Sequence, residues 1–143
     1  VRLPRLVGFE NANMMLRTTR PISSEKALAF GLIREEVEGD LVDRAVALCR
    51  DMADGTAPRS RMDEGPVQDV PEQLPQVEIG HLSRKVDEIL QKAILGAAKL
   101  PLAEAVPFEA KCFGEVCGTE DMRIGVQNFL TNGPKSKADF VHR

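Results

Sequence analysis

The chain has 143 residues, of which 43% are hydrophobic and 4% aromatic, and its formal net charge is −3. This length suits one domain, and the apolar content is sufficient for a core. A negative net charge argues against a protein that binds nucleic acid or an anionic membrane, since neutralising phosphates requires a basic face. No apolar run approaches the roughly 20 residues that span a bilayer, so we expect no membrane partner and a cytoplasmic location.

The residue types favour helices. Trp and Tyr are absent, and the chain is rich in Ala, Leu and Glu, which favours helices packed by aliphatic side chains over a sandwich or a barrel. We therefore predict a mainly α fold with at most one or two short strands. The three cysteines, Cys49, Cys112 and Cys117, lack the paired spacing of a zinc site, so we expect them to be reduced and no metal to be bound.

The chain opens with short helical segments. Residues 2–7 read as the end of a helix that stops at Gly8, and a second short helix follows before Pro21, which disfavours helix in the residue before it. Ser23 is a good N-cap for a further helix that ends by Gly31.

The next segments are a strand, a helix and a loop. Residues 32–37 read as one short strand. Asp40 then caps an amphipathic helix that closes at Gly55. Residues 56–80 hold Pro58, Pro66, Pro71 and Pro75 with little periodic apolar content, so we predict a long loop or a linker there.

The rest of the chain is predicted to be helical. An amphipathic helix follows Gly80, Pro101 separates it from a second one, and Thr119 caps a third that ends by Gly133. A polar, basic tail follows. We divide the chain accordingly into residues 1–55, a loop at 56–80, and a helical cover or oligomerisation region at 81–143.

Motifs of the commonest enzyme classes are absent. The sequence contains no glycine-rich dinucleotide or P-loop motif, no C-x-x-C pair and no G-x-S-x-G motif. One constellation is a candidate ligand site, because ammonium groups hold phosphates and a Phe ring stacks on an adenine. Its members are Lys135 and Lys137, with Phe129 and Phe140 on either side.

Two blocks of sequence resemble the enoyl-CoA hydratase/isomerase (crotonase) family. The first begins RLPRLVGFENANMMLRTTRPISSEKALAFGLIREEV and continues through the helix LVDRAVALCRDMADG. The second runs from LPLAEAVPFEAKCFGEVCGTEDMRIGVQNFL into the tail. It resembles the closing pattern of the family, although Thr131, Asn132, Gly133 and Pro134 replace the usual basic pair after the Phe-Leu step.

This resemblance implies the helical C-terminal part of a crotonase-like α/β fold. The chain opens at Val1 without Met and without a preceding strand-rich region, so we expect an N-terminal catalytic half to be missing. In the family, that half supplies the two backbone N–H groups that polarise the thioester oxygen and the carboxylates that move protons. We therefore assign no catalytic residue to this chain. The resemblance implies an acyl-CoA thioester as the substrate, with no separate cofactor.

The resemblance also implies roles for the helical part. In the family it forms trimer contacts and covers the acyl-CoA, with a basic tail near the nucleotide phosphates. It therefore supports coenzyme A contacts by Lys135, Lys137, Phe129 and Phe140, while Met14 and Met15 match the helix that flanks the acyl pocket. A second hypothesis stays open: a helical oligomerisation or partner-binding module without a ligand.

Overall fold

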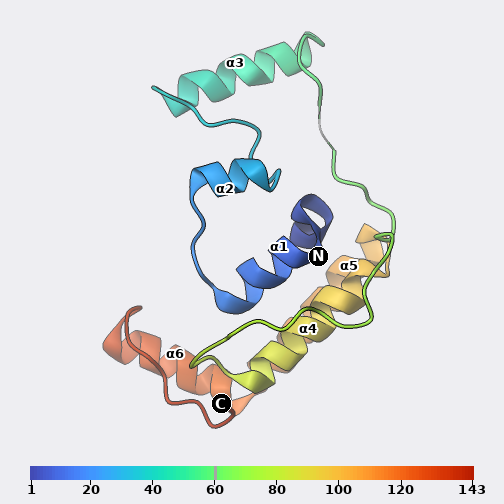
Figure 1. Ribbon diagram of the computed structural model, residues 1–143. Helices are drawn as coiled ribbons and strands as arrows, with labels where there is room; N and C mark the ends of the chain where they lie inside the picture. The colour runs from blue at the N-terminus through green and yellow to red at the C-terminus, as the bar shows by residue number, and fades with distance from the viewer. Residues whose placement is uncertain (60) are drawn as a thin grey trace. The chain divides into compact units, whose positions relative to one another are not determined.

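The computed structural model describes residues 1–59 and 61–143, and within these ranges the regular structure is helical without any strand. This agrees with the predicted mainly α fold. Figure 1 shows the helices in chain order. They are α1 (Arg2–Thr18), α2 (Ser24–Ala29), α3 (Leu41–Ala53), α4 (Arg84–Ala98), α5 (Leu102–Cys117) and α6 (Glu120–Asn132).

The chain forms two compact units. The larger unit consists of Val1–Pro21 together with Glu64–Arg143, and therefore contains α1, α4, α5 and α6. The smaller unit is Ile22–Asp63 and contains α2 and α3. The three functional segments expected from the sequence remain a prediction.

Helix α1 is kinked at Gly8. This residue has φ 77° and ψ 168°, so the backbone leaves the helical conformation there and resumes it afterwards. A positive φ costs glycine little because it has no Cβ. The helical end predicted at Gly8 is thus present, and the short helix expected after it continues to Thr18.

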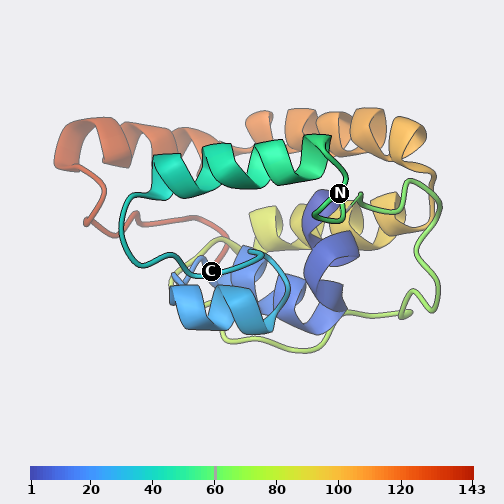
Figure 2. The same ribbon diagram turned by 90° about the horizontal axis from the view of Figure 1, so that it is seen from above.

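Helices α4 and α5 form the centre of the larger unit. They lie side by side, joined by a short turn at Lys99–Pro101 (Figures 1 and 2). Their close approach uses Gly96, where an added Cβ would lie 2.5 Å from the ring of Phe108. Ile94 and Ala97 of α4 and Ala105 of α5 are buried.

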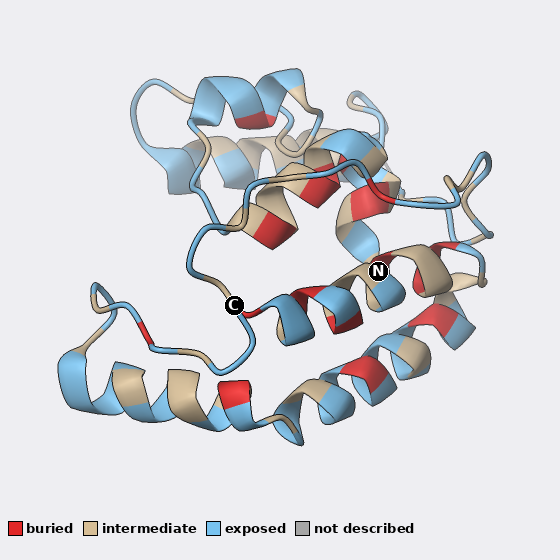
Figure 3. Cartoon of the chain, turned by 60° about the horizontal axis from the view of Figure 1, so that its bottom comes forward, coloured by how far each residue is buried: buried red, intermediate tan, exposed pale blue. Residues whose placement is uncertain are grey.

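Residues 64–80 of the proline-rich segment belong to the larger unit and contain no helix. The Val67 amide donates to the Ala98 carbonyl at 2.8 Å, and the Leu102 amide donates to the Glu64 carbonyl at 2.7 Å. Leu74 is buried. Such bonds satisfy the last carbonyl groups of α4 and the first amides of α5, which have no partner within their own helices. Figure 3 shows the buried residues in red along the helices.

The smaller unit contains α2 and α3, and the strand predicted over residues 32–37 is wrong. The amides of Leu32 and Ile33 both donate to the Ala27 carbonyl, at 2.9 and 3.3 Å. The segment therefore begins by closing the end of α2, and it has no strand partner in the described residues. A strand is stable only when its backbone groups pair with a neighbouring strand.

Helix α3 is capped by Asp40, whose carboxylate accepts from the amides of Val42 and Asp43 at 2.8 and 2.9 Å. None of its residues is buried. Its apolar side, which includes Leu41, Val42 and Val46, is exposed.

Candidate functional site

The lysines of the predicted ligand constellation lie on a turn directly after α6. Gly133, with φ 81°, ends the helix, and the Ser136 hydroxyl then donates to the Gly133 carbonyl at 2.8 Å. The Asn128 side chain donates to the Ser136 hydroxyl at 2.8 Å. Lys135 and Lys137 flank this fixed serine, and both are exposed. Within the described residues, neither ammonium group has a hydrogen bond or an ion pair.

The two phenylalanines of the constellation have different surroundings. Phe129 is 56% exposed on α6. Phe140 is half-buried, and its ring lies 3.4 Å from the position that a Cβ on Gly125 would occupy. Gly125 is one helical turn before Phe129, so both rings lie over the same face of α6. Phe129 therefore presents the freer ring to a ligand.

The predicted acyl-pocket residues, Met14 and Met15, are half-buried in the second part of α1. They line none of the described cavities. Their neighbours Leu16 and Arg17 do line one, described below. The proposed role of the two methionines stays a prediction.

Asp121, in the first turn of α6, is a completely buried carboxylate with 0% exposure. Its Oδ2 accepts from the Ser83 hydroxyl at 2.5 Å and lies 3.1 Å from His142 Nδ1. Two tail amides also donate to this carboxylate, Val141 to Oδ1 at 2.8 Å and His142 to Oδ2 at 3.3 Å. Asp121 thus joins α6, the start of α4 and the tail.

The hydrogen bonds of Asp121 decide its protonation. Desolvation by burial raises the pKa of this carboxyl, but the bonds from Ser83, Val141 and His142 lower it by more, so the pKa is lowered from the ordinary value of 3.8. The group is therefore a carboxylate at neutral pH. Donors that stabilise the charged form make it a fixed acceptor rather than a proton donor.

A second buried carboxylate, Asp87 in the first turn of α4, pairs with Arg17 of α1. Arg17 Nε donates to Asp87 Oδ1 at 2.7 Å, and Nη2 donates to Oδ2 at 2.8 Å. Arg17 Nη1 also donates to the Asn13 side-chain oxygen and to the Pro75 carbonyl, both at 3.0 Å. This bidentate pair connects α1, α4 and the proline-rich segment.

A cavity of about 200 Å³ lies between the two carboxylates. Its polar lining includes Arg17, Asp87, Ser83 and Asp121, and its apolar lining includes Leu16, Val86, Leu90, Met122 and Phe140. Because the charged groups here already bond to protein partners, the cavity offers a ligand mainly apolar contacts.

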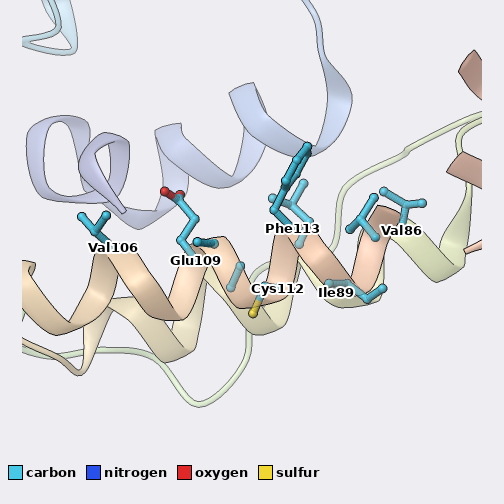
Figure 4. A pocket seen from close by; sticks show the side chains of 10 residues that line it. Val86, Ile89, Val106, Glu109, Cys112 and Phe113 are labelled. Carbon is cyan, nitrogen blue, oxygen red and sulfur yellow. The ribbon is translucent and has the colours of Figure 1, made fainter. Parts of the chain in front are cut away.

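A larger apolar groove of about 570 Å³ runs between α4 and α5 (Figure 4). Val106, Glu109 and Phe113 project from the same side of α5, as expected for residues three and four apart. The α4 side of the groove consists of Val86, Ile89, Leu90 and Ala93. Phe113 and Val106 are exposed, so the groove is an uncovered apolar surface.

The described residues were compared with the patterns of a metal site and of a membrane-spanning helix. In these ranges no group of three or more His, Cys, Asp or Glu side chains could hold a metal ion. Within the same ranges, each helix is too short or too polar to cross a bilayer. Cys49, Cys112 and Cys117 are free thiols, and only Cys112 is buried.

The chain is similar to a distant relative among known proteins. The chain is 26% identical, over 143 residues, to a protein of Rhizobium meliloti (strain 1021) described as a probable enoyl-CoA hydratase. The alignment covers 99% of this chain and 44% of that protein, so the chain spans less than half the length of the curated relative it matches. No protein-family model matches the chain, and no solved structure matches it.

Asp121 was not recognised as a site residue from the sequence. An acidic residue in the first turn after the Thr119 cap is common in helices, so its position alone does not indicate burial. Helical periodicity puts Asp87 opposite the apolar residues of α4, which predicts an exposed side chain, but the residue is buried. The signal that could have found these groups is weak: each acidic residue is two to four positions after a Ser or Thr cap, a pattern that many exposed residues share.

Proposed function

We propose that this chain is the helical C-terminal part of an enoyl-CoA hydratase/isomerase-like protein that acts on acyl-CoA thioesters. The observation that carries the proposal is the similarity to the Rhizobium meliloti protein, which extends over 99% of the chain. Because that alignment covers 44% of the relative, the catalytic groups would come from sequence outside this chain. The contribution of the chain is then to bind part of the coenzyme A and to make subunit contacts.

The geometry of the tail supports a role in coenzyme A binding. Lys135 and Lys137 are exposed cations without protein partners in the described part of the chain, on a turn whose backbone is fixed by Ser136. An ammonium group binds a phosphate as a point charge, and a fixed backbone lowers the ordering cost of binding. The exposed ring of Phe129 lies on the adjacent helix and offers a stacking surface for an adenine.

Calorimetric titration with coenzyme A tests this proposal. We expect saturable binding that is lost in the double variant Lys135→Ala and Lys137→Ala. The matched control is Lys99→Ala with Lys111→Ala, which removes the same charge from two exposed lysines elsewhere. Pantetheine lacks the nucleotide phosphates and the adenine of coenzyme A, so we expect its titration to show no binding that depends on Lys135 and Lys137. Absence of coenzyme A binding to the unmodified chain, or equal losses in the two double variants, would contradict the proposal.

The proposal also predicts that the isolated chain does not hydrate crotonyl-CoA, since no catalytic residue is assigned to it. Hydration of crotonyl-CoA by the purified chain, above a heat-inactivated control, would show that the chain carries its own catalytic groups. That result would overturn the assignment to a non-catalytic part.

A second candidate function is a helical oligomerisation or partner-binding module. It is favoured by the exposed apolar side chains of α5 and α6, which are Val106, Phe113, Val126 and Leu130. Large exposed apolar patches commonly mark interaction sites. Light scattering at tens of micromolar distinguishes the candidates. An oligomer that dissociates on Phe113→Glu and binds no coenzyme A supports this module, whereas coenzyme A binding that depends on the tail lysines supports the first proposal.

A further inference from the structure

The tail returns to the body of the larger unit after the lysine turn. Val141 and His142 bond to Asp121, which is 20 and 21 positions earlier in the chain. The His142 carbonyl accepts from the amide of Arg84, the first residue of α4, at 2.7 Å. Figure 1 places the C-terminal end beside the starts of α4 and α6. The tail is therefore held at a junction of two helix N-termini.

Ser83 has a double role at this junction. Its hydroxyl accepts from the Val86 amide at 3.1 Å, which caps α4, and it donates to Asp121 Oδ2 at 2.5 Å. A hydroxyl accepts and donates through the same oxygen atom, whereas an aspartate at the same position would cap the helix but repel Asp121. The cap of α4 and the attachment of the tail thus share one side chain.

We propose that Asp121 and Ser83 form a latch that fixes the tail and thereby positions Lys135 and Lys137 for the phosphates of a nucleotide ligand. The ligand part of this inference rests on the proposed function. The two residues are positioning residues, since neither is placed to touch the ligand. The latch holds residues 141 and 142, while Asn128 and Ser136 hold the other end of the tail.

Fixing both ends has a thermodynamic consequence for binding. Lys137 lies between the two fixed points, and Lys135 directly precedes the first of them. A free tail would lose backbone conformational freedom when it ordered around a phosphate, and that loss would weaken binding. The latch also keeps Phe140 against Gly125, since Phe140 directly precedes the first latched amide. Opening the latch should therefore release Phe140 and lower the affinity for the ligand.

Hydrogen exchange of residues 134–143 measures the latch directly, because two of its bonds are the tail amides of Val141 and His142. For Asp121→Asn we expect exchange at these amides to accelerate about tenfold or more, since bonds to a charged acceptor are lost. The matched control is Glu120→Gln, which removes a neighbouring exposed carboxylate and should change nothing. Unchanged tail exchange in Asp121→Asn would overturn the latch.

If Asp121→Asn also accelerates exchange in α4 and α5, the variant destabilises the whole unit and does not isolate the tail. Variants of Ser83 then provide the test. Ser83→Thr retains the hydroxyl and should keep the tail protected, whereas Ser83→Asp retains a cap and should release the tail. Equal tail protection in these two variants would overturn the role of Ser83.

Coenzyme A titration of the same variants tests the positioning role. The positioning role is supported if every variant with a released tail binds coenzyme A more weakly while hydrogen exchange in α4 and α5 is unchanged. It is overturned if a variant with a released tail binds coenzyme A with unchanged affinity. If the unmodified chain binds no coenzyme A, the proposed function and the positioning role fail together, and hydrogen exchange alone decides whether the latch itself exists.

Discussion

The two buried carboxylates of the larger unit occupy similar local positions but are stabilised in different ways. Asp87 and Asp121 each lie in the first turn of a helix capped by a Ser or Thr hydroxyl. Asp87 is 9% exposed and forms a bidentate pair with Arg17, which is 6% exposed. Asp121 is fully buried, and its donors are one hydroxyl, two backbone amides and the half-exposed His142 ring.

The difference shows how one local pattern serves two structural purposes. The Asp87 centre joins α1, α4 and the Pro75 carbonyl through a cation, so removing either partner leaves a buried group without its counter-charge. The Asp121 centre contains no Arg or Lys partner, and its donors approach from the tail and the start of α4. Its disruption should release the tail rather than unfold the unit.

The largest expected effect is that of Arg17→Met. Because this change leaves the Asp87 carboxylate buried and unpaired, we expect the free energy of unfolding to fall by about 3–5 kcal/mol. Urea denaturation followed by circular dichroism measures the loss. The control is Arg20→Met, since Arg20 is exposed three residues later. Similar losses in the two variants would show that the ion pair is not what stabilises this centre.

The next expected effect is a recovery. Adding Asp87→Leu to Arg17→Met removes the unpaired charge, and apolar replacements of buried ion pairs are often neutral or stabilising. We expect the double variant to regain most of the lost stability in the same urea experiment. Some loss should remain, because Gln91 donates to Asp87 Oδ2 and Asn13 accepts from Arg17. A double variant that is less stable than Arg17→Met would contradict this account.

Acid should release the tail before it unfolds the larger unit. The folded-state pKa of Asp121 is below the ordinary 3.8, so the stabilisation by its carboxylate is present above that value and is lost as the pH falls through the folded pKa. Other ionisable groups near the tail are His142, Arg84, Lys85, Glu88 and Arg143. We expect the NMR signals of the Val141 and His142 amides to shift below pH 3.8, with no such step in Asp121→Asn. Tail release that begins well above pH 3.8 would contradict the role of Asp121.

The smallest expected effect concerns the exposed pair of Lys92 and Glu115, 2.8 Å apart between α4 and α5. The Lys92 pKa is raised and the Glu115 pKa is lowered, in each case chiefly by their mutual hydrogen bond. Solvent and salt screen such pairs. We expect Lys92→Met to leave the unfolding free energy nearly unchanged, with any small difference disappearing in 1 M salt. If Lys92→Met lowered the free energy of unfolding as much as Arg17→Met does, the exposed ion pair would stabilise the protein as strongly as the buried one, which contradicts this account.

Much of the helical pattern was predictable from local chemistry. The predicted caps are Ser23, Asp40 and Thr119, and the side chain of each accepts a hydrogen bond from a backbone amide two or three residues later. Gly8 interrupts the helical backbone of α1, as expected. Local chemistry was not sufficient to predict whether residues 32–37 form a strand. Its apolar residues suited a strand, but a strand needs a partner, and the amides of Leu32 and Ile33 instead bond to Ala27.

The candidate site was predictable in part. Lys135, Lys137 and Phe129 are exposed, as a ligand-binding role requires, and their contact with coenzyme A stays a prediction. The seating of Phe140 on Gly125 was not predictable, because the tail reaches that position only through its bonds to Asp121.

The sequence by itself determined where the helices start and stop, since caps, prolines and glycines act through bonds that span only a few residues. It also carried the similarity on which the proposed function depends. Only the tertiary structure decided which acidic groups are buried and where the tail lies. Arg17 and Asp87 are 70 positions apart, and Asp121 and His142 are 21 apart. Whether such groups meet depends on the packing of whole helices, which no local pattern specifies.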